Sequence, residues 1–134
     1  MIHLSWECTP RGSVRQIESN ARELNAIMRL VETFRTVDTV LPAQMAQCFL
    51  AVAIRPGLTA QNLAEMTSLS QAAVSRNIRA LGKHHRYDKP GFELIEAVPD
   101  PAETRRQIMF LTPKGQKLAT ELISALRGEE PAGG

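Results

Sequence analysis

The residues best suited to chemistry lie in one stretch, 58–81, which reads LTAQNLAEMTSLSQAAVSRNIRAL. If a helix begins at Ser70, then Val74, Ile78 and Leu81 form one apolar stripe that faces a core. The positions beside this stripe carry hydroxyls, an amide and guanidiniums, and no acid: Ser70, Gln71, Ser75, Arg76 and Arg79. Such groups hydrogen-bond to base edges and phosphates, so the pattern favours a helix, over residues 70–82, that enters the major groove of DNA.

The segment that follows is basic. It carries Lys83, Arg86 and Lys89, with only Asp88 against them. Charge runs are commonly solvated loops, but this one directly extends the candidate helix, so phosphate contacts are favoured over that alternative. His84 and His85 also lie here, and they have no further ligand at metal-binding spacing, so no metal site is expected.

Two strands are expected at 92–98 and 107–111, the second with a period of two. The polar, proline-marked turn between them, residues 99–106, carries Arg105 and Arg106 at its end. Adjacent arginines on a protruding hairpin can enter a narrow minor groove. The alternative is that they pair with Glu103 or Asp100 and stiffen the turn, and both can hold together.

Other helices must position these elements. A helix that begins at Ser13 carries an apolar seam at alternating steps of three and four residues, formed by Val14, Ile17, Ala21, Leu24, Met28 and Val31. This seam indicates either an ordinary core helix with two neighbours or, as we favour, a dimerisation helix. A second helix begins at Pro42, buries Cys48 as a hydrophobe, and ends before Pro56. The last helix, 113–127, follows a Thr112 cap and ends at Gly128.

The helix before the one expected over residues 70–82 has a clear start signal at Thr59, whose hydroxyl can cap the first turn. The third helical position is Asn62 rather than Glu or Gln, so the reciprocal half of a capping box is expected to be missing. The turn between the two helices contains Ser68. A non-glycine residue with a positive φ at this point would cost about 1 kcal/mol.

Length and composition narrow the class of protein to which the chain can belong. A chain of 134 residues supports one domain with one core. We divide it into an arm (1–12), a dimerisation helix (13–37), a winged-helix domain (38–112), a C-terminal helix (113–127) and a disordered tail (128–134). Two cysteines, and no secretory or membrane-spanning pattern, favour a reduced cytoplasmic protein. The net charge of +2 is modest, and aromatic residues make up 4%, which argues against a base-stacking platform.

Taken together, these elements predict a mainly α-helical winged helix-turn-helix with a small β-hairpin wing. At this level the chain resembles the MarR family of bacterial transcription regulators, from about residue 41 to residue 122. The wing motif of that family reads Asp-x-Arg, five residues, then Leu-Thr-x-x-Gly. The matching residues here are Glu103, Arg105, Leu111, Thr112 and Gly115.

The resemblance implies a homodimer that binds a pseudo-palindromic duplex. No cofactor is expected. It implies that Gln71, Ser75, Arg76 and Arg79 face the major groove, that Arg105 enters the minor groove and that Glu103 orients it. Dimer contacts from the first and last helices would include Ile17, Leu24, Met28, Leu118 and Leu122. The chain departs from the family in Glu103 for Asp, in Ser68 for Gly, in a longer basic loop and in a short last helix. A small-molecule effector stays open, although few aromatics and the short helix argue against one.

The function predicted is sequence-specific binding of double-stranded DNA by a transcription regulator that acts in the manner of a repressor. No catalytic constellation is present in the sequence, so an enzyme is not expected. Two alternatives stay open: a winged helix used as a protein-interaction or assembly module, and a DNA-binding accessory factor of replication or recombination.

Overall fold

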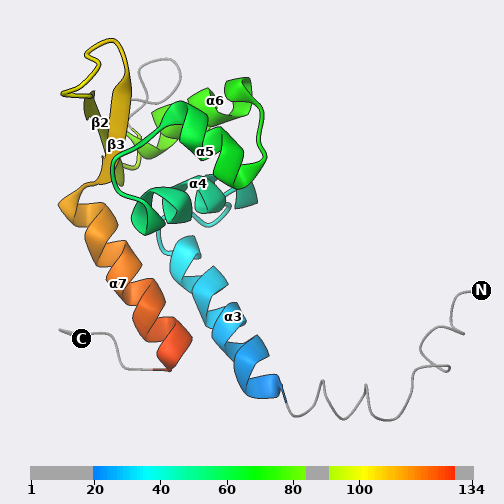
Figure 1. The fold of residues 1–134 in the computed structure, drawn as a ribbon. Coiled ribbons are helices and arrows are strands. Elements are labelled where there is room, and N and C mark those ends of the chain that lie inside the picture. Colours follow the sequence, from blue (N-terminus) through cyan, green and yellow to red (C-terminus); the bar gives the residue numbers. More distant parts are fainter. Residues whose placement is uncertain (1–19, 84–90, 129–134) are drawn as a thin grey trace, which may run out of the picture.

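The computed structural model describes residues 20–83 and 91–128 (Figure 1). Within them the elements follow in the order α3 (Ala21–Arg35), α4 (Ala43–Ile54), β1 (Leu58–Thr59), α5 (Ala60–Thr67), α6 (Gln71–Leu81), β2 (Ile95–Pro99), β3 (Gln107–Leu111) and α7 (Pro113–Arg127). The prediction of a mainly helical chain with a small β-hairpin wing is confirmed. The predicted helix start at Ser13, the arm and residues 129–134 lie outside the described residues.

The helices form two groups. The helices α4, α5 and α6 pack on one another beside the sheet, whereas α3 and α7 run side by side away from them (Figure 1). The Nε of Arg29 on α3 donates a hydrogen bond to the carbonyl oxygen of Ala125 near the end of α7, at 3.0 Å. The same carbonyl oxygen accepts from the amide of Gly128 at 3.2 Å, so the Arg29 bond adds a second donor at the end of α7 and ties the two helices together. None of the helices described is long and apolar enough to cross a membrane.

The core fills the space between α4, α5, α6 and the sheet. Its largest fully buried side chains are Phe49, Leu63, Leu81, Leu94, Met109, Val52, Val74 and Cys48. Phe34 of α3 meets Phe49 edge to face, with ring centroids 6.1 Å apart, so the first helix is attached to the same core. Burial raises the pKa of the Cys48 thiol to about 11, as expected of a buried hydrophobe.

The sheet has three antiparallel strands in the order β1-β3-β2. Strand β3 lies where it was predicted, but β1 was not predicted, and it pairs Leu58 with Met109. Strand β2 begins at Ile95 rather than Phe92, because the preceding backbone bonds to the end of α6 instead. The amide of Phe92 donates to the carbonyl of Ala80 at 3.0 Å, and Leu94 donates to Leu81 at 2.8 Å.

The junction between β3 and α7 explains the spacing of the Leu-Thr-x-x-Gly segment. The hydroxyl of Thr112 accepts from the amide of Gly115 at 3.0 Å and donates to the carbonyl of Glu93 at 2.6 Å. A Cβ on Gly115 would lie 2.1 Å from the carbonyl oxygen of Leu94. Only glycine therefore lets the first turn of α7 pack directly on the backbone that leads into the wing. Glu93 itself adopts φ 57°, a conformation that was not predicted.

Candidate nucleic-acid interface

The helix-turn-helix consists of α5, a short turn and α6. Thr59 and Asn62 form a complete capping box: Asn62 N–H donates to the Thr59 hydroxyl, and the Thr59 N–H donates to the Asn62 side-chain oxygen, both at 3.1 Å. The expectation that the reciprocal bond would be missing is wrong, because an Asn side chain also reaches the cap. Ser68 ends α5 with φ 60° and ψ 25°, the left-handed conformation considered for it.

The recognition helix α6 is fixed from one side. The Ser70 hydroxyl accepts from the amide of Ala73 at 3.1 Å and starts the helix, as predicted. Val74 and Leu81 are fully buried against the core. Asn77 is also buried, and its side chain donates to the carbonyl of Ala73 at 2.8 Å. The orientation of α6 is therefore set by its inner face, which leaves the outer face to contact a partner.

The outer face of α6 carries the side chains that were singled out from the sequence. The members of this set are all exposed and include no acid: Ser70, Gln71, Ser75, Arg76 and Arg79. Lys83, just beyond the helix, is exposed as well. Arg86 and Lys89, the other predicted phosphate contacts, lie outside the described residues. The structure thus brings the capping residue Ser70 and four side chains of α6 together with Lys83 at the end of the helix.

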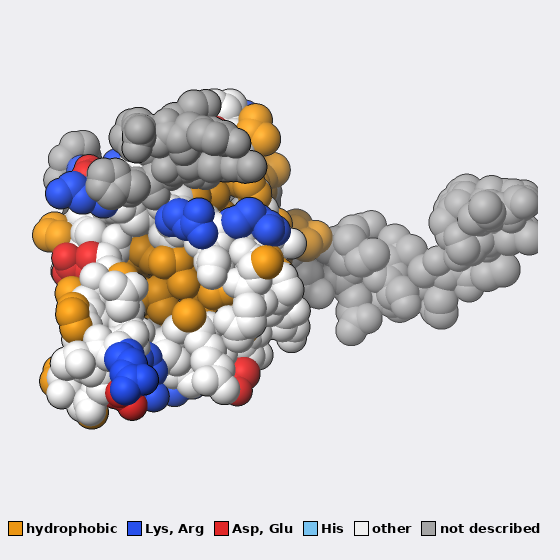
Figure 2. Space-filling model, turned by 90° about the horizontal axis from the view of Figure 1, so that it is seen from above, with side chains coloured by type: hydrophobic (Ala, Val, Ile, Leu, Met, Phe, Trp, Pro, Cys, Tyr) orange, Lys and Arg blue, Asp and Glu red, His pale blue; other side chains and the backbone are white. Residues whose placement is uncertain are grey.

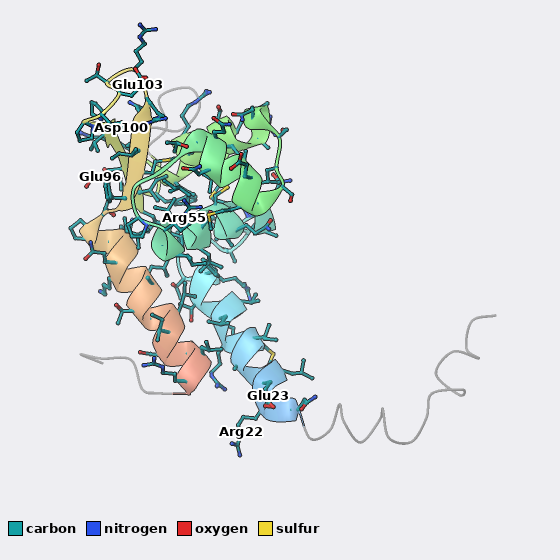
Figure 3. The ribbon with its side chains drawn as sticks, in the orientation of Figure 1. Arg22, Glu23, Arg55, Glu96, Asp100 and Glu103 are labelled. Carbon is teal, nitrogen blue, oxygen red and sulfur yellow. The ribbon has the colours of Figure 1, made fainter. Side chains whose placement is uncertain are left out.

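The wing is the β2–β3 hairpin, and residues 100–106 form its tip. Here Asp100 pairs with Arg106: the guanidinium Nη2 and Nε lie 2.8 Å and 3.0 Å from the same carboxylate oxygen. The other carboxylate oxygen accepts from the amide of Ala102 at 2.9 Å. The amide of Ala102 and then the guanidinium of Arg106 lower the pKa of Asp100. Figure 3 shows Asp100 and Glu103 at the wing end of the molecule, opposite Arg22.

The wing and α6 border a common hollow of about 420 Å³. Its apolar floor includes Ile78 from α6 and Ala97 from β2, and Arg105 and Arg106 lie at its wing side. Figure 2 shows the face of the molecule that carries the wing tip, with Lys and Arg side chains around a central apolar area. This hollow therefore joins α6 to the wing through Ile78, whereas the exposed residues predicted on α6 are not among the described residues that line it.

A second surface runs along α3. The apolar side chains Leu24, Ile27, Met28 and Val31 follow the helical spacing i, i+3, i+4 and i+7, and each is 52–56% exposed. Leu118 and Leu122, predicted at the dimer interface, are buried in the core of the single chain instead. The exposed apolar residues of α7 are Ile123 and Leu126. Ile17 lies outside the described residues.

Within residues 20–83 and 91–128, no group of three or more histidine, cysteine or acidic side chains could hold a metal ion. The exposed polar groups on α6 are hydroxyls, an amide and guanidiniums, and the wing adds the guanidinium of Arg105. What this arrangement can do is bind a polyanion and read hydrogen-bond acceptors on it.

No family model matches the sequence, and no curated protein matches it. Solved structures do match. RV1404 from Mycobacterium tuberculosis has a TM-score of 0.68 at 17% identity, over 90% of this chain and 76% of that one. A mutant of S. aureus MepR bound to an oligodeoxyribonucleotide has a TM-score of 0.61 at 21% identity, over 90% of this chain and 78% of that one. A MarR family transcription regulator gives 0.52 at 20% identity, over 95% and 68%.

The fold is that of the MarR family. Within this MarR fold, sequence reasoning missed two features of the interface region. Strand β1 fixes the start of α5 beside β3, and Glu93 turns the chain between α6 and the wing. The pairing of Arg106 with Asp100 is one of the alternatives that the sequence left open for the wing arginines.

Proposed function

We propose that this protein is a sequence-specific, double-stranded DNA-binding transcription regulator that inserts α6 into the major groove and the wing into the minor groove. The observation that carries the proposal is the outer face of α6, where exposed hydroxyl, amide and guanidinium groups occur without any acid. The inner edge of the same helix, at Ile78, borders a hollow that the wing arginines also line. The MepR mutant with a similar fold is bound to an oligodeoxyribonucleotide, which supports a nucleic-acid partner for this fold.

Sequence choice is assigned to the residues at the start and middle of α6. Gln71, Ser75 and Arg76 project from a helix whose roll is fixed by Val74 and Leu81 in the core. A fixed roll matters because a bidentate contact to a base edge requires the side chain to arrive in one orientation. An arginine–guanine pair of this kind contributes about 1–3 kcal/mol of discrimination.

Affinity is assigned to the groups around that reading face. Arg79 and Lys83 come after the proposed base-reading residues of α6. Arg86 and Lys89 extend the same basic run in the sequence. At the wing, Arg105 is the proposed minor-groove residue, and the orienting role of Glu103 stays a prediction. Each phosphate contact releases counterions, so the contribution of these residues to affinity is largely independent of the DNA sequence.

The protein acts as a homodimer in this proposal. The apolar row on α3, with Leu24 and Met28 at its centre, leaves more than half of each side chain exposed in the single chain. A second copy that covers this row, together with Ile123 and Leu126, removes it from water at about 25 cal/mol per Å² of apolar surface. Two copies related by a two-fold axis present two α6 helices, which matches a pseudo-palindromic site. Occupation of such a site excludes polymerase, which is the repressor-like action proposed here.

Selection of bound duplexes from a random pool tests the proposal directly. The selected duplex is then titrated at several salt concentrations. With six to eight basic groups on phosphates, the logarithm of affinity should fall with log salt at a slope of about −5 to −7. The reading role of Arg76 is tested by Arg76→Ala, which should relax preference at one or two base positions at a cost of about 1–3 kcal/mol.

The matched control is Arg22→Ala, which removes one positive charge at the opposite end of the molecule (Figure 3). It should leave both base preference and salt slope unchanged. Failure to enrich any duplex, or binding that does not respond to salt, contradicts the proposed function. Light scattering of the intact chain beside Leu24→Glu tests the dimer separately, and an unchanged mass would show that the α3 row does not join two copies.

A further inference from the structure

The wing has two adjacent arginines, and the structure gives them different surroundings. The guanidinium of Arg106 donates twice to one carboxylate oxygen of Asp100, at 2.8 Å and 3.0 Å. The side chain of Asp100 is 13% exposed and that of Arg106 is 53% exposed. Within the part of the chain that the structure describes, no carboxylate lies within ion-pair distance of Arg105. Only one of the two arginines therefore has its charge compensated inside the wing.

The backbone reinforces this pairing. The amide of Asp100 donates to the carbonyl of Arg106 at 2.8 Å, and the amide of Arg106 donates to the carbonyl of Glu103 at 2.9 Å. The second carboxylate oxygen of Asp100 accepts from the amide of Ala102, so both oxygens are used. Residues 100–106 are thus closed on themselves by main-chain and side-chain bonds that converge on Asp100. The Asp100 side chain therefore fixes the position of the Arg106 guanidinium as well as stabilising the turn.

We propose that Asp100 is a positioning residue that holds Arg106 back in the wing, so that Arg105 alone reaches the DNA. This inference rests on the proposed function, and it assigns Arg106 to the wing's own structure rather than to a DNA contact. A paired Asp100 and Arg106 contribute no net charge toward phosphate, whereas Arg105 contributes one. Each protomer therefore brings one wing cation to the duplex.

The salt dependence of binding distinguishes the two arginines, because its slope counts phosphate contacts rather than stability. Arg105→Gln should flatten the slope by about 0.9 for each protomer. Arg106→Gln should leave the slope at the wild-type value. Asp100→Asn should steepen it by about 0.9 for each protomer, since the released Arg106 becomes a new phosphate contact, and the Asp100→Asn, Arg106→Gln double variant should return it to the wild-type value.

The result that overturns the inference is a flattening by Arg106→Gln equal to that of Arg105→Gln. That outcome means that Arg106 already contacts phosphate in the wild-type complex. The double variant is the control for a wing that Asp100→Asn has merely loosened, because it lacks both Asp100 and the Arg106 charge. A merely structural role for the pair predicts that Asp100→Asn and Arg106→Gln change the slope alike, and this also contradicts the proposal.

A measurement on the free protein separates this inference from the proposed function. In nitrogen-edited NMR spectra, the Nε–H of Arg106 should exchange with water more slowly than that of Arg105, because only the former donates to a carboxylate. Asp100→Asn should remove the difference. Glu103→Gln, which neutralises a neighbouring wing carboxylate, should preserve it. Equal exchange in the wild-type protein overturns the inference, whereas slow Arg106 exchange in a protein that binds no duplex contradicts only the proposed function.

Discussion

Replacing Ser68 with glycine should stabilise the protein. Ser68 ends α5 in the left-handed conformation, with φ 60° and ψ 25°, and it is exposed. A residue with a Cβ loses about 1–2 kcal/mol in this conformation, which glycine adopts without strain. Glycine in turn has a larger loss of backbone entropy on folding, about 0.5–1 kcal/mol. The difference leaves Ser68→Gly more stable by about 0.5–1 kcal/mol.

Urea unfolding followed by far-ultraviolet circular dichroism measures this change. The midpoint should rise while the m-value is unchanged, and Tm should rise by about 2–5 °C for a domain of this size. The same substitution at Ser75 is the matched control, because Ser75 is also exposed but lies within the regular helix α6. There, glycine should lower stability by about 0.5 kcal/mol. Equal destabilisation at both sites would refute the reasoning, because it would mean that Ser68 carries no strain that glycine can relieve.

Three further predictions follow from the contacts. Gly115→Ala places a Cβ 2.1 Å from the carbonyl oxygen of Leu94, so it should lower the free energy of unfolding by at least about 2 kcal/mol, measured by urea unfolding; no change would exclude this packing. Thr59→Ala removes half of the capping box and should cost about 1 kcal/mol, whereas a cost near zero would show that the Asn62 bond alone suffices. The folded pKa of Asp100 is lowered, so its contribution to wing stability is complete above its ordinary pKa of about 3.9 and is lost as pH falls below that value. Amide exchange of Ala102 measured against pH should show this loss, and Asp100→Asn should abolish the dependence; an unchanged profile in that variant would assign it to another group.

Local signals in the sequence predicted most of the fold. Ser70, Thr59 and Thr112 each lie just before an apolar stripe, and each caps the helix that was expected to follow it. Caps and stripes are short-range features, because a hydroxyl and the amide it accepts from are only three residues apart. The exposed set on α6 was identified for the same reason: once the stripe of Val74 and Leu81 is known, the opposite face is determined by helical geometry.

The features that sequence reasoning missed depend on neighbours that are distant in the chain. Strand β1 has two residues, which is too few for any periodicity, and it exists because Leu58 lies opposite Met109. The burial of Leu118 and Leu122, which were predicted at the dimer interface, within the core of the single chain was missed for a related reason. An apolar stripe shows that a helix face is covered, but it does not say whether the cover is the same chain or another one. Here the core takes these two leucines and leaves Ile123 and Leu126 exposed.

The wing shows why charge arguments need a structure. The sequence offers two arginines beside two acids, so a count of charges alone makes the wing tip neutral. The structure shows where these charges lie: Asp100 is paired with Arg106 within the wing, while Arg105 has no carboxylate within ion-pair distance among the described residues. The same reasoning applies to the whole chain, whose net charge is only +2. In the proposed function, attraction to DNA therefore comes from where the cations lie, on α6 and at the tip of the wing, rather than from their excess over the acids.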